Sequence, residues 1–262
     1  MSDRLSETAP GGAETRLAVR GLSMRYPNGK LALDGVDLTV RAGELVTILG
    51  SNGSGKTTLL RCIARLLDPT EGEVRVGGQD LACLNGQALR EARLALAMVF
   101  QRANLVRRRS VLANVASGTL GRRRTLWTTL GGLPAEELPL ARELLRKVGV
   151  ERLGAQRADT LSGGQAQRAA IARALAQRPK LILADEPVAS LDPEAAEEIM
   201  RLLRQLAVES GLAVLCVLHQ PALAQRYSHR VVGLRDGIVA FDLPADLCAD
   251  QEIALLYKDI AA

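Results

Sequence analysis

The sequence predicts an α/β fold with a mostly parallel sheet, an antiparallel β-subdomain before it and an α-helical subdomain inserted into it. Four short runs are apolar throughout and then turn abruptly polar, which is typical of parallel strands buried on both faces. Helical patterns separate these runs, as the crossovers of a parallel sheet require. Two earlier runs alternate apolar and polar residues, which indicates half-buried antiparallel strands.

The first part of the chain contains the expected antiparallel strands. Residues 1–15 are polar and rich in Gly, Ser, Thr and Glu, so we expect a disordered tail followed by one domain over 16–262. The two alternating runs are LAVRGLSMRY (17–26) and ALDGVDLTV (32–40). Pro27-Asn28-Gly29 lies between them and indicates a turn.

The four buried strands are predicted at ELVTILG (44–50), ALAMVFQ (95–101), KLILADE (180–186) and LAVLCVLH (212–219). They end at Gly50, at Gln101, at the pair Asp185-Glu186, and at His219. Ligands of an open parallel sheet bind beyond the carboxyl ends of its strands. We therefore expect a glycine loop, an amide, two carboxylates and an imidazole to meet at one edge of the sheet.

Helices are expected between these strands. One covers 57–67 and is stopped by Asp68-Pro69, and another covers 162–178 and is stopped by Pro179. A third runs over 193–210, with Asp192 as its N-cap and Gly211 just past its end. The segment from about 86 to 160 has helical patterns after its single strand, which indicates the inserted helical subdomain. Near the C-terminus, Asp236-Gly237 predicts a β-hairpin.

The composition narrows the function classes. Aromatic residues make up only 2% of the chain, which argues against a protein that stacks bases on exposed rings. The net charge of +5 permits nucleic acid, an anionic membrane surface or acidic ligands as partners. The four cysteines form no CxxC pair, so zinc or disulfide chemistry is not expected. Without a secretory signal or a long apolar segment, the protein is expected to be cytosolic.

A phosphate-binding loop is the strongest motif. Residues 50–57 (GSNGSGKT) fit the pattern GxxxxGK[ST] after a predicted strand and before a predicted helix. Backbone N–H groups of such a loop surround phosphates, and the helix N-terminus adds a favourable dipole. We expect Lys56 to reach the β- and γ-phosphates and Thr57 to bind Mg²⁺. The expected nucleotide-binding residues here are Gly50, Ser51, Asn52, Gly53, Ser54, Gly55, Lys56, Thr57 and Thr58.

The carboxylates of LILADEP complete the pattern of an NTPase. Asp185 at a strand end can hold Mg²⁺, and Glu186 can orient or deprotonate an attacking water. An Asp-Glu pair alone would be an ordinary surface pair, so its meaning depends on the phosphate-binding loop.

The segment LSGGQAQRAAIARAL (161–175) resembles the signature motif of the ABC ATPase family, a group of P-loop NTPases with a RecA-like core. The other family motifs follow in order and cover the chain after its tail. Tyr26 is similar to the aromatic residue that stacks on adenine, Gln101 to the Q-loop glutamine, Ser190-Leu191-Asp192 to the D-loop, and His219 to the switch histidine. His229 matches no motif and is expected to be structural.

The resemblance implies roles for these residues and for their partners. ATP and Mg²⁺ are the implied cofactors, with Thr57, Gln101 and Asp185 as metal ligands and with Glu186, His219 and Gln101 in catalysis. In a head-to-tail homodimer, the signature and D-loop residues of one subunit would contact the ATP held by the other. These residues are Ser162, Gly163, Gly164 and Asp192. A Ser-Gly-Gly at a helix N-terminus suits this role because it offers a hydroxyl, amides and a dipole to an anion.

Further segments resemble the ATPases of phosphonate importers: YPNGKLALDGVDLTV (26–40), FQRANLVRRRSVLANV (100–115), ADEPVASLDP (184–193) and the end from LHQ to VVGLRDGIVAFD (218–242). GRRRTLWTTLGGLP (121–134) falls where those ATPases have a longer connection in the helical subdomain. This implies two integral membrane permease subunits, a solute-binding protein outside the membrane, and a location on the cytoplasmic face of the cell membrane. An importer of phosphite or phosphate remains an alternative. So does a soluble ABC ATPase acting on nucleic acid, although nucleic acid is not expected as a partner.

The motifs do not explain Pro221 or two runs of arginine. Pro221 disfavours helical geometry at Gln220 and could alter the loop after His219. The arginine runs 107–109 and 122–124 fit a solvated basic face, or contact with an acidic segment of the membrane subunit or with anionic headgroups.

Overall fold

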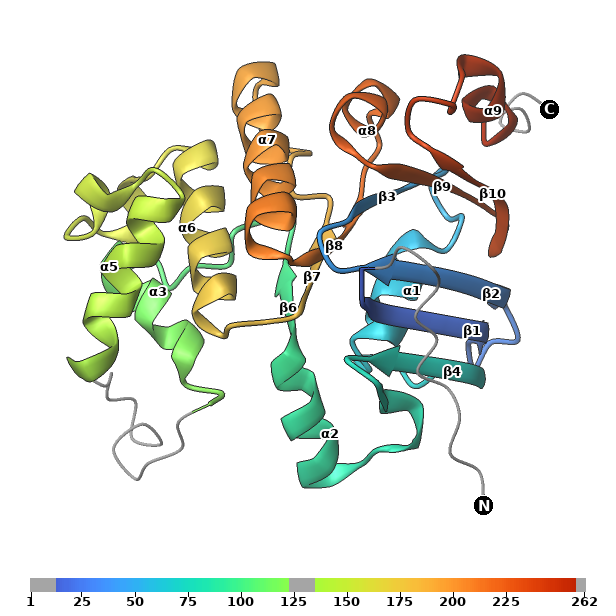
Figure 1. The fold of residues 1–262 in the computed structure, drawn as a ribbon, viewed down its shortest axis with the longest axis horizontal. Helices are drawn as coiled ribbons and strands as arrows, with labels where there is room; N and C mark the ends of the chain where they lie inside the picture. Colours follow the sequence, from blue (N-terminus) through green and yellow to red (C-terminus); the bar gives the residue numbers. More distant parts are fainter. Residues whose placement is uncertain (1–12, 123–134, 258–262) are drawn as a thin grey trace.

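The computed structural model describes residues 13–122 and 135–257, and two β-sheets organise this part of the chain (Figure 1). The smaller sheet has the strand order β2-β1-β4-β5, and the larger has the order β10-β9-β3-β8-β7-β6. This architecture confirms the predicted combination of an antiparallel β-subdomain with a mostly parallel sheet.

The smaller sheet is antiparallel throughout. Its strands are β1 (Thr15–Arg25), β2 (Leu31–Arg41), β4 (Glu71–Val76) and β5 (Gln79–Asp80). The first two were predicted, and they pair across the turn at Pro27-Asn28-Gly29. Strand β4 was not predicted, because only its Val74 and Val76 are apolar and point to the core. Two apolar positions are too few to establish a period of two.

The larger sheet contains the four predicted parallel strands, β3 (Leu45–Leu49), β6 (Leu96–Val99), β7 (Leu181–Asp185) and β8 (Ala213–Val217). The predicted hairpin, β9 (Arg230–Arg235) and β10 (Ile238–Pro244), extends it beside β3. Asp236 and Gly237 have φ values of 48° and 81°, the left-handed backbone that a two-residue hairpin turn needs.

Helices pack around the sheets. They are α1 (Lys56–Ile63), α2 (Gly86–Ala92), α3 (Val111–Ala116), α5 (Leu138–Lys147), α6 (Gly163–Ala176), α7 (Pro193–Ser210), α8 (Pro221–Tyr227) and α9 (Asp250–Leu255). Short 3₁₀ helices cover Leu81–Cys83, Arg93–Ala95, Ser117–Thr119, Ala135–Glu137, Glu151–Leu153 and Ala158–Thr160. Figure 1 shows α3, α5 and α6 together, on the side of the molecule away from the smaller sheet. Val115, Leu145 and Ile171 pack in their shared core.

The predicted helix over 57–67 was wrong at its C-terminus, because α1 ends at Ile63. Arg65 takes a left-handed conformation (φ 54°), and the amides of Arg65 and Leu66 donate to the carbonyls of Cys62 and Arg61. This is the pattern of a Schellman C-cap. The Arg65 side chain is buried and donates to the carbonyl of Leu81, so tertiary contact stops the helix before Asp68-Pro69.

The helix predicted over 193–210 is confirmed as α7. The carboxylate of Asp192 accepts a hydrogen bond from the amide of Ala195, and Gly211 has a φ of 62°. Pro221 is the first residue of α8, and Gln220 before it is extended (φ −109°, ψ 99°), as predicted. Proline suits this position because the first N–H of a helix has no intrahelical partner.

Several expectations fall outside the described residues. They concern residues 1–12 of the predicted tail, Arg123 and Arg124 of the second arginine run, and the part of the predicted helical subdomain between 123 and 134. The division into a tail over 1–15, a domain over 16–262 and an insertion at about 86–160 stays a prediction, and β1 begins at Thr15. Within 13–122 and 135–257, no helix combines the length and the apolar character needed to cross a bilayer.

Candidate functional site

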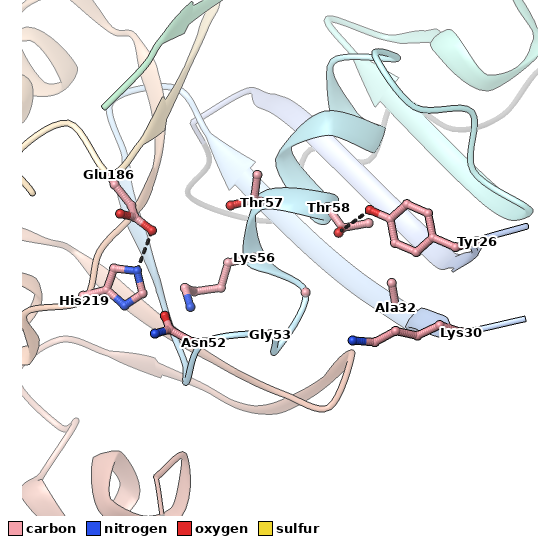
Figure 2. Close-up of a pocket in the computed structure, with 11 residues that line it drawn as sticks. Tyr26, Lys30, Ala32, Asn52, Gly53, Lys56, Thr57, Thr58, Glu186 and His219 are labelled. Atoms are coloured by element: carbon pink, nitrogen blue, oxygen red, sulfur yellow. Dashed lines mark hydrogen bonds and ion pairs between the residues drawn. The ribbon is translucent and has the colours of Figure 1, made fainter. Parts of the chain in front are cut away.

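Predicted site residues of the phosphate-binding loop converge with Tyr26, Glu186 and His219 at the carboxyl edge of the parallel sheet. A cavity of about 290 Å³ opens there, and Figure 2 draws the side chains around it. Its walls come from the β1–β2 turn, the loop after β3, the first turn of α1 and the ends of β7 and β8. The lining residues are Tyr26, Lys30, Ala32, Asn52, Gly53, Gly55, Lys56, Thr57, Thr58, Glu186 and His219.

The phosphate-binding loop is folded tightly around its own lysine. The Lys56 ammonium is buried and donates to the carbonyl oxygens of Gly50 and Ser51, both at 2.8 Å. Burial lowers the pKa of Lys56, and the negative charges of Glu186 and Asp185 oppose that shift. Gly55 is left-handed (φ 104°), and a Cβ there would lie 2.6 Å from the carbonyl oxygen of Ala32. Only glycine lets this loop pass so close to β2.

Two oxygen groups meet beside the phosphate-binding loop. The hydroxyl of Thr57 donates to Asp185 Oδ1 over 3.4 Å. Burial raises the pKa of Asp185, and the neighbouring charge of Glu186 raises it further. A hard divalent cation prefers such oxygen ligands and would stabilise the ionised carboxylate. The donor set therefore fits Mg²⁺ at Thr57 and Asp185.

Glu186 and His219 form a direct pair beside the loop (Figure 2). His219 Nε2 lies 2.5 Å from Glu186 Oε1, and the two side chains are 35% and 21% exposed. Glu186 has a φ of 50°, a left-handed conformation that is uncommon for a residue other than glycine. Strained backbone of this kind clusters at functional sites, where it aims a side chain. The carboxylate remains accessible to water from the cavity.

Tyr26 closes the opposite end of the cavity. Its hydroxyl lies 3.1 Å from the Thr58 hydroxyl of α1, which holds the ring above the first helical turn. An aromatic ring at this place offers an apolar face to a base. Lys30 and Ala32 line the same end, and neither was predicted from the sequence. They belong to no motif, and only the hairpin turn brings them next to Tyr26.

The structure does not bring Gln101 into the cavity. Gln101 is exposed two residues beyond β6 and is not among the lining residues, so its role as a metal ligand and in catalysis stays a prediction. Gln167, which no motif singled out, connects this segment to α6. Its buried side-chain amide donates to the carbonyl of Phe100 at 3.0 Å. The available signal was its spacing, because Gln167 lies three and four residues before Ala170 and Ile171 on the apolar face of the helix.

The signature segment lines a second cavity of about 300 Å³ that shares no residue with the first. The Ser162 hydroxyl accepts from the amide of Gln165, whose side chain accepts from the amide of Ser162. This capping box satisfies two amides at the start of α6, where Ser162 and Gly163 are exposed. The cavity is lined by Ser162, Gly163, Gly164, Gln165, Arg168, Ser190, Leu191, Asp192, Ala195 and Glu198.

The glycines of the signature segment pack against the D-loop segment. A Cβ on Gly163 would lie 3.0 Å from Leu191 Cδ2, and one on Gly164 would lie 3.2 Å from Ala195 Cβ. Arg168 spans the cavity wall and forms an ion pair with Glu198 at 2.7 Å. The structure thus brings all four signature and D-loop residues together, but away from the phosphate-binding loop of the same chain.

His229 is structural, as predicted. Its Nδ1 accepts a hydrogen bond from the amide of Leu45 at 2.9 Å, which ties β9 to the start of β3. Burial lowers the pKa of His229, so the neutral ring that can accept this bond is favoured.

Comparison with known proteins agrees with this geometry. Residues 33–189 match the family described as ABC transporter. The phosphonates import ATP-binding protein PhnC of Thiobacillus denitrificans is 46% identical over 243 residues, covering 92% of this chain and 92% of that protein. PhnC of Bacillus cereus is 43% identical over 242 residues, covering 92% and 94%.

A solved structure is also similar. It is the dimeric structure of a post-hydrolysis state of the ATP-binding cassette MJ0796 bound to ADP and Pi. The TM-score is 0.76 at 35% identity, covering 87% of this chain and 98% of that one.

Proposed function

The chain belongs to the ABC transporter family, and on that premise we propose that it is the ATP-hydrolysing subunit of an importer that takes up phosphonates. The observation that carries the ATPase assignment is the first cavity, where a phosphate-binding loop, an oxygen pair and a Glu–His pair meet. The names of the similar PhnC proteins support phosphonate as the cargo.

Phosphate binding follows from the loop. The ammonium of Lys56 donates its hydrogen bonds to the carbonyls of Gly50 and Ser51. A triphosphate would offer it a negative partner, which makes stronger charge-assisted hydrogen bonds than neutral carbonyls do. Backbone amides from Gly53 to Thr58 and the N-terminus of α1 would hold the remaining phosphate oxygens. Tyr26 would stack on the base at the other end.

Hydrolysis needs a water aligned with the terminal phosphate. Glu186 is the carboxylate that can accept a proton from that water or orient it. His219 holds Glu186 through their 2.5 Å contact and can donate to a phosphate oxygen after moving slightly. In phosphoryl transfer, such positioning and charge stabilisation supply most of the catalysis.

A magnesium ion fits the same arrangement. Thr57 and Asp185 would hold it, and when bound it would neutralise charge on the β- and γ-phosphates. The ion would in turn stabilise Asp185, because a buried carboxylate without a nearby cation is disfavoured in its ionised form.

The second cavity supports a homodimer. Its open helix N-terminus is suited to an anion, yet the phosphate-binding loop of the same chain lies elsewhere. A head-to-tail pair with two-fold symmetry would place each signature cavity over the partner's loop and produce two equal sites. The remaining partners of the proposed importer are two permease subunits and a solute-binding protein, with this chain on the cytoplasmic face of the membrane.

The proposal is tested with the chain assembled with its permease in lipid vesicles. ATP turnover is measured while solute-binding protein loaded with a phosphonate, with phosphate or with phosphite is added. We expect stimulation by the phosphonate-loaded protein above the other two. Stimulation by phosphate or phosphite alone would overturn the cargo, and stimulation by nucleic acid without the permease would overturn the importer.

A further inference from the structure

Lys30 is a second lysine of the nucleotide cavity, and neither the motifs nor the proposed mechanism uses it. It lies at the end of the cavity that Tyr26 closes, whereas Lys56 lies deep in the loop. Figure 2 shows the Lys30 side chain extending from the hairpin toward Gly53, so its ammonium points along the cavity. Among the residues that line the cavity the only acidic one is Glu186, which lies at the opposite end from Lys30 (Figure 2).

The hairpin turn fixes this placement. The amide of Tyr26 donates to the carbonyl of Lys30 at 2.9 Å, and the amide of Gly29 donates to the carbonyl of Tyr26 at 2.8 Å. The amide of Lys30 donates to Asn28 Oδ1 at 3.1 Å. These three bonds hold Tyr26 and Lys30 side by side on one turn. The turn that positions the Tyr26 ring for a base therefore also positions the positive charge of Lys30 beside it.

We propose that the Lys30 ammonium pairs with the α-phosphate of the bound nucleotide, an inference that rests on the proposed ATPase function. The residues suited to the terminal phosphate, Lys56, Glu186 and His219, lie at the far end of the cavity (Figure 2). Tyr26 marks the base end. A nucleotide stretched between them passes the Lys30 ammonium with its sugar and first phosphate, and the phosphate carries the charge that an ammonium prefers.

This contact has a distinct kinetic consequence. ATP and ADP share the α-phosphate, so Lys30 stabilises both to the same extent and makes no contact that changes during hydrolysis. Such uniform binding lowers KM without raising kcat. Lys56 differs, because its expected contacts include the phosphate that is transferred.

The test is nucleotide binding by the full chain carrying Lys30→Ala. Calorimetric titration with ADP and with a non-hydrolysable ATP analogue, each with Mg²⁺, should give dissociation constants raised by one common factor of about three to ten. Because the pair is partly exposed, the factor should shrink as the salt concentration rises. In the assembled transporter, KM for ATP should rise by the same factor while kcat stays within about twofold.

Two matched variants control the experiment. Lys30→Arg keeps the positive charge and should bind both nucleotides within about twofold of wild type. Lys180→Ala removes an exposed lysine just before β7, at the opposite edge of the sheet, and should leave both affinities unchanged. Unchanged thermal unfolding of Lys30→Ala would exclude a structural cause for its weaker binding.

The outcomes separate this inference from the function on which it rests. If wild type binds neither nucleotide, the ATPase proposal itself fails. If wild type binds both and Lys30→Ala binds them equally well, only the role of Lys30 is overturned. A loss confined to the ATP analogue would also overturn it, because the contact would then be with the terminal phosphate.

Discussion

The two cavities of this chain are built in different ways. The phosphate-binding cavity takes its residues from the β1–β2 turn, the loop after β3 and the ends of β7 and β8. The signature cavity takes its residues from only two short stretches, 162–168 and 190–198, which pack against each other through Gly163 and Leu191. The first exists only when the whole sheet has formed. The second depends on two helix N-termini.

Their chemistry differs as well. In the phosphate-binding cavity the charged groups already have partners: the Lys56 ammonium donates to carbonyls of its own loop, and Glu186 contacts the His219 ring. The signature cavity offers hydroxyl, amide and dipole donors at the start of α6, while its ion pair joins Arg168 to Glu198. One cavity holds the groups that can activate water. The two carboxylates of the other already have partners, Asp192 in the amide of Ala195 and Glu198 in Arg168. Under the proposed dimer, each cavity therefore supplies what the other lacks.

The largest effect is expected inside the phosphate-binding cavity. Glu186→Gln keeps the shape of the side chain and removes its basicity, so turnover in the assembled transporter should fall by about 10²- to 10⁴-fold. ATP affinity should stay within a few-fold, and the ATP-bound dimer should persist in size-exclusion chromatography. Glu71→Gln, at an exposed position at the start of β4, is the matched control and should keep wild-type turnover. Rapid turnover by Glu186→Gln would remove that carboxylate from the mechanism.

The next largest effect is expected in the signature cavity. Gly164→Asp places a carboxylate at the open start of α6, where like-charge repulsion with the partner's phosphates should cost several kcal/mol. Turnover should fall by about 10²-fold and the ATP-dependent dimer should be lost, while the isolated chain should bind ATP normally. Gly164→Ala adds the same Cβ, 3.2 Å from Ala195, without the charge, and controls for crowding. Impaired nucleotide binding by the isolated Gly164→Asp chain would contradict the separation of the two cavities.

A smaller effect is expected at the base end of the first cavity. Tyr26→Ala removes the ring and should raise the dissociation constants of ATP and ADP by about tenfold. Tyr26→Phe keeps the ring and loses only the hydrogen bond to Thr58, so it should bind nearly as tightly as wild type. Fluorescence titration with ATP and with ADP measures the dissociation constants of both variants. Equal loss in the two variants would mean that the hydroxyl contact, and not stacking, is what matters.

The smallest effect concerns stability. Burial, and then the charge of Glu186, raises the pKa of Asp185, so the folded chain holds this proton more tightly than the unfolded chain does. Stability should therefore fall as the pH rises from about 3.9, the ordinary aspartate value, through the raised pKa. Asp185→Asn should unfold a few degrees above wild type at neutral pH without Mg²⁺ and nucleotide.

That difference should vanish below about pH 4, where Asp185 is protonated in both states. Asp246→Asn on the exposed segment after β10 is the control and should not shift thermal unfolding. A lower unfolding temperature for Asp185→Asn at neutral pH would show that the ionised Asp185 carboxylate does not destabilise the fold.

The sequence predicted the local features of the molecule well. The start of α7 at Pro193 and its end before Gly211 follow from capping chemistry within a few residues. The four parallel strands were recognised because each is apolar on both faces. Parallel pairing then places their polar ends at one edge, which is why Asp185, Glu186 and His219 were grouped correctly.

What the sequence did not predict depends on tertiary contacts. The end of α1 is set by the buried Arg65 side chain and the distant carbonyl of Leu81, and no local pattern encodes that contact. Lys30 enters the cavity only because the hairpin turn carries it beside Tyr26. Gln101 follows a correctly predicted strand, but its side chain is exposed and does not line the cavity.

The most direct test of the central claim mixes two inactive chains. Lys56→Ala breaks the phosphate-binding cavity and leaves the signature cavity intact, whereas Gly164→Asp does the reverse. If a working site takes one cavity from each of two chains, mixed dimers contain one intact site. An equal mixture should then recover about a quarter of the wild-type turnover, although neither variant is active alone. No recovery, with both variants folded and mixed dimers detected, would contradict a site shared between two chains.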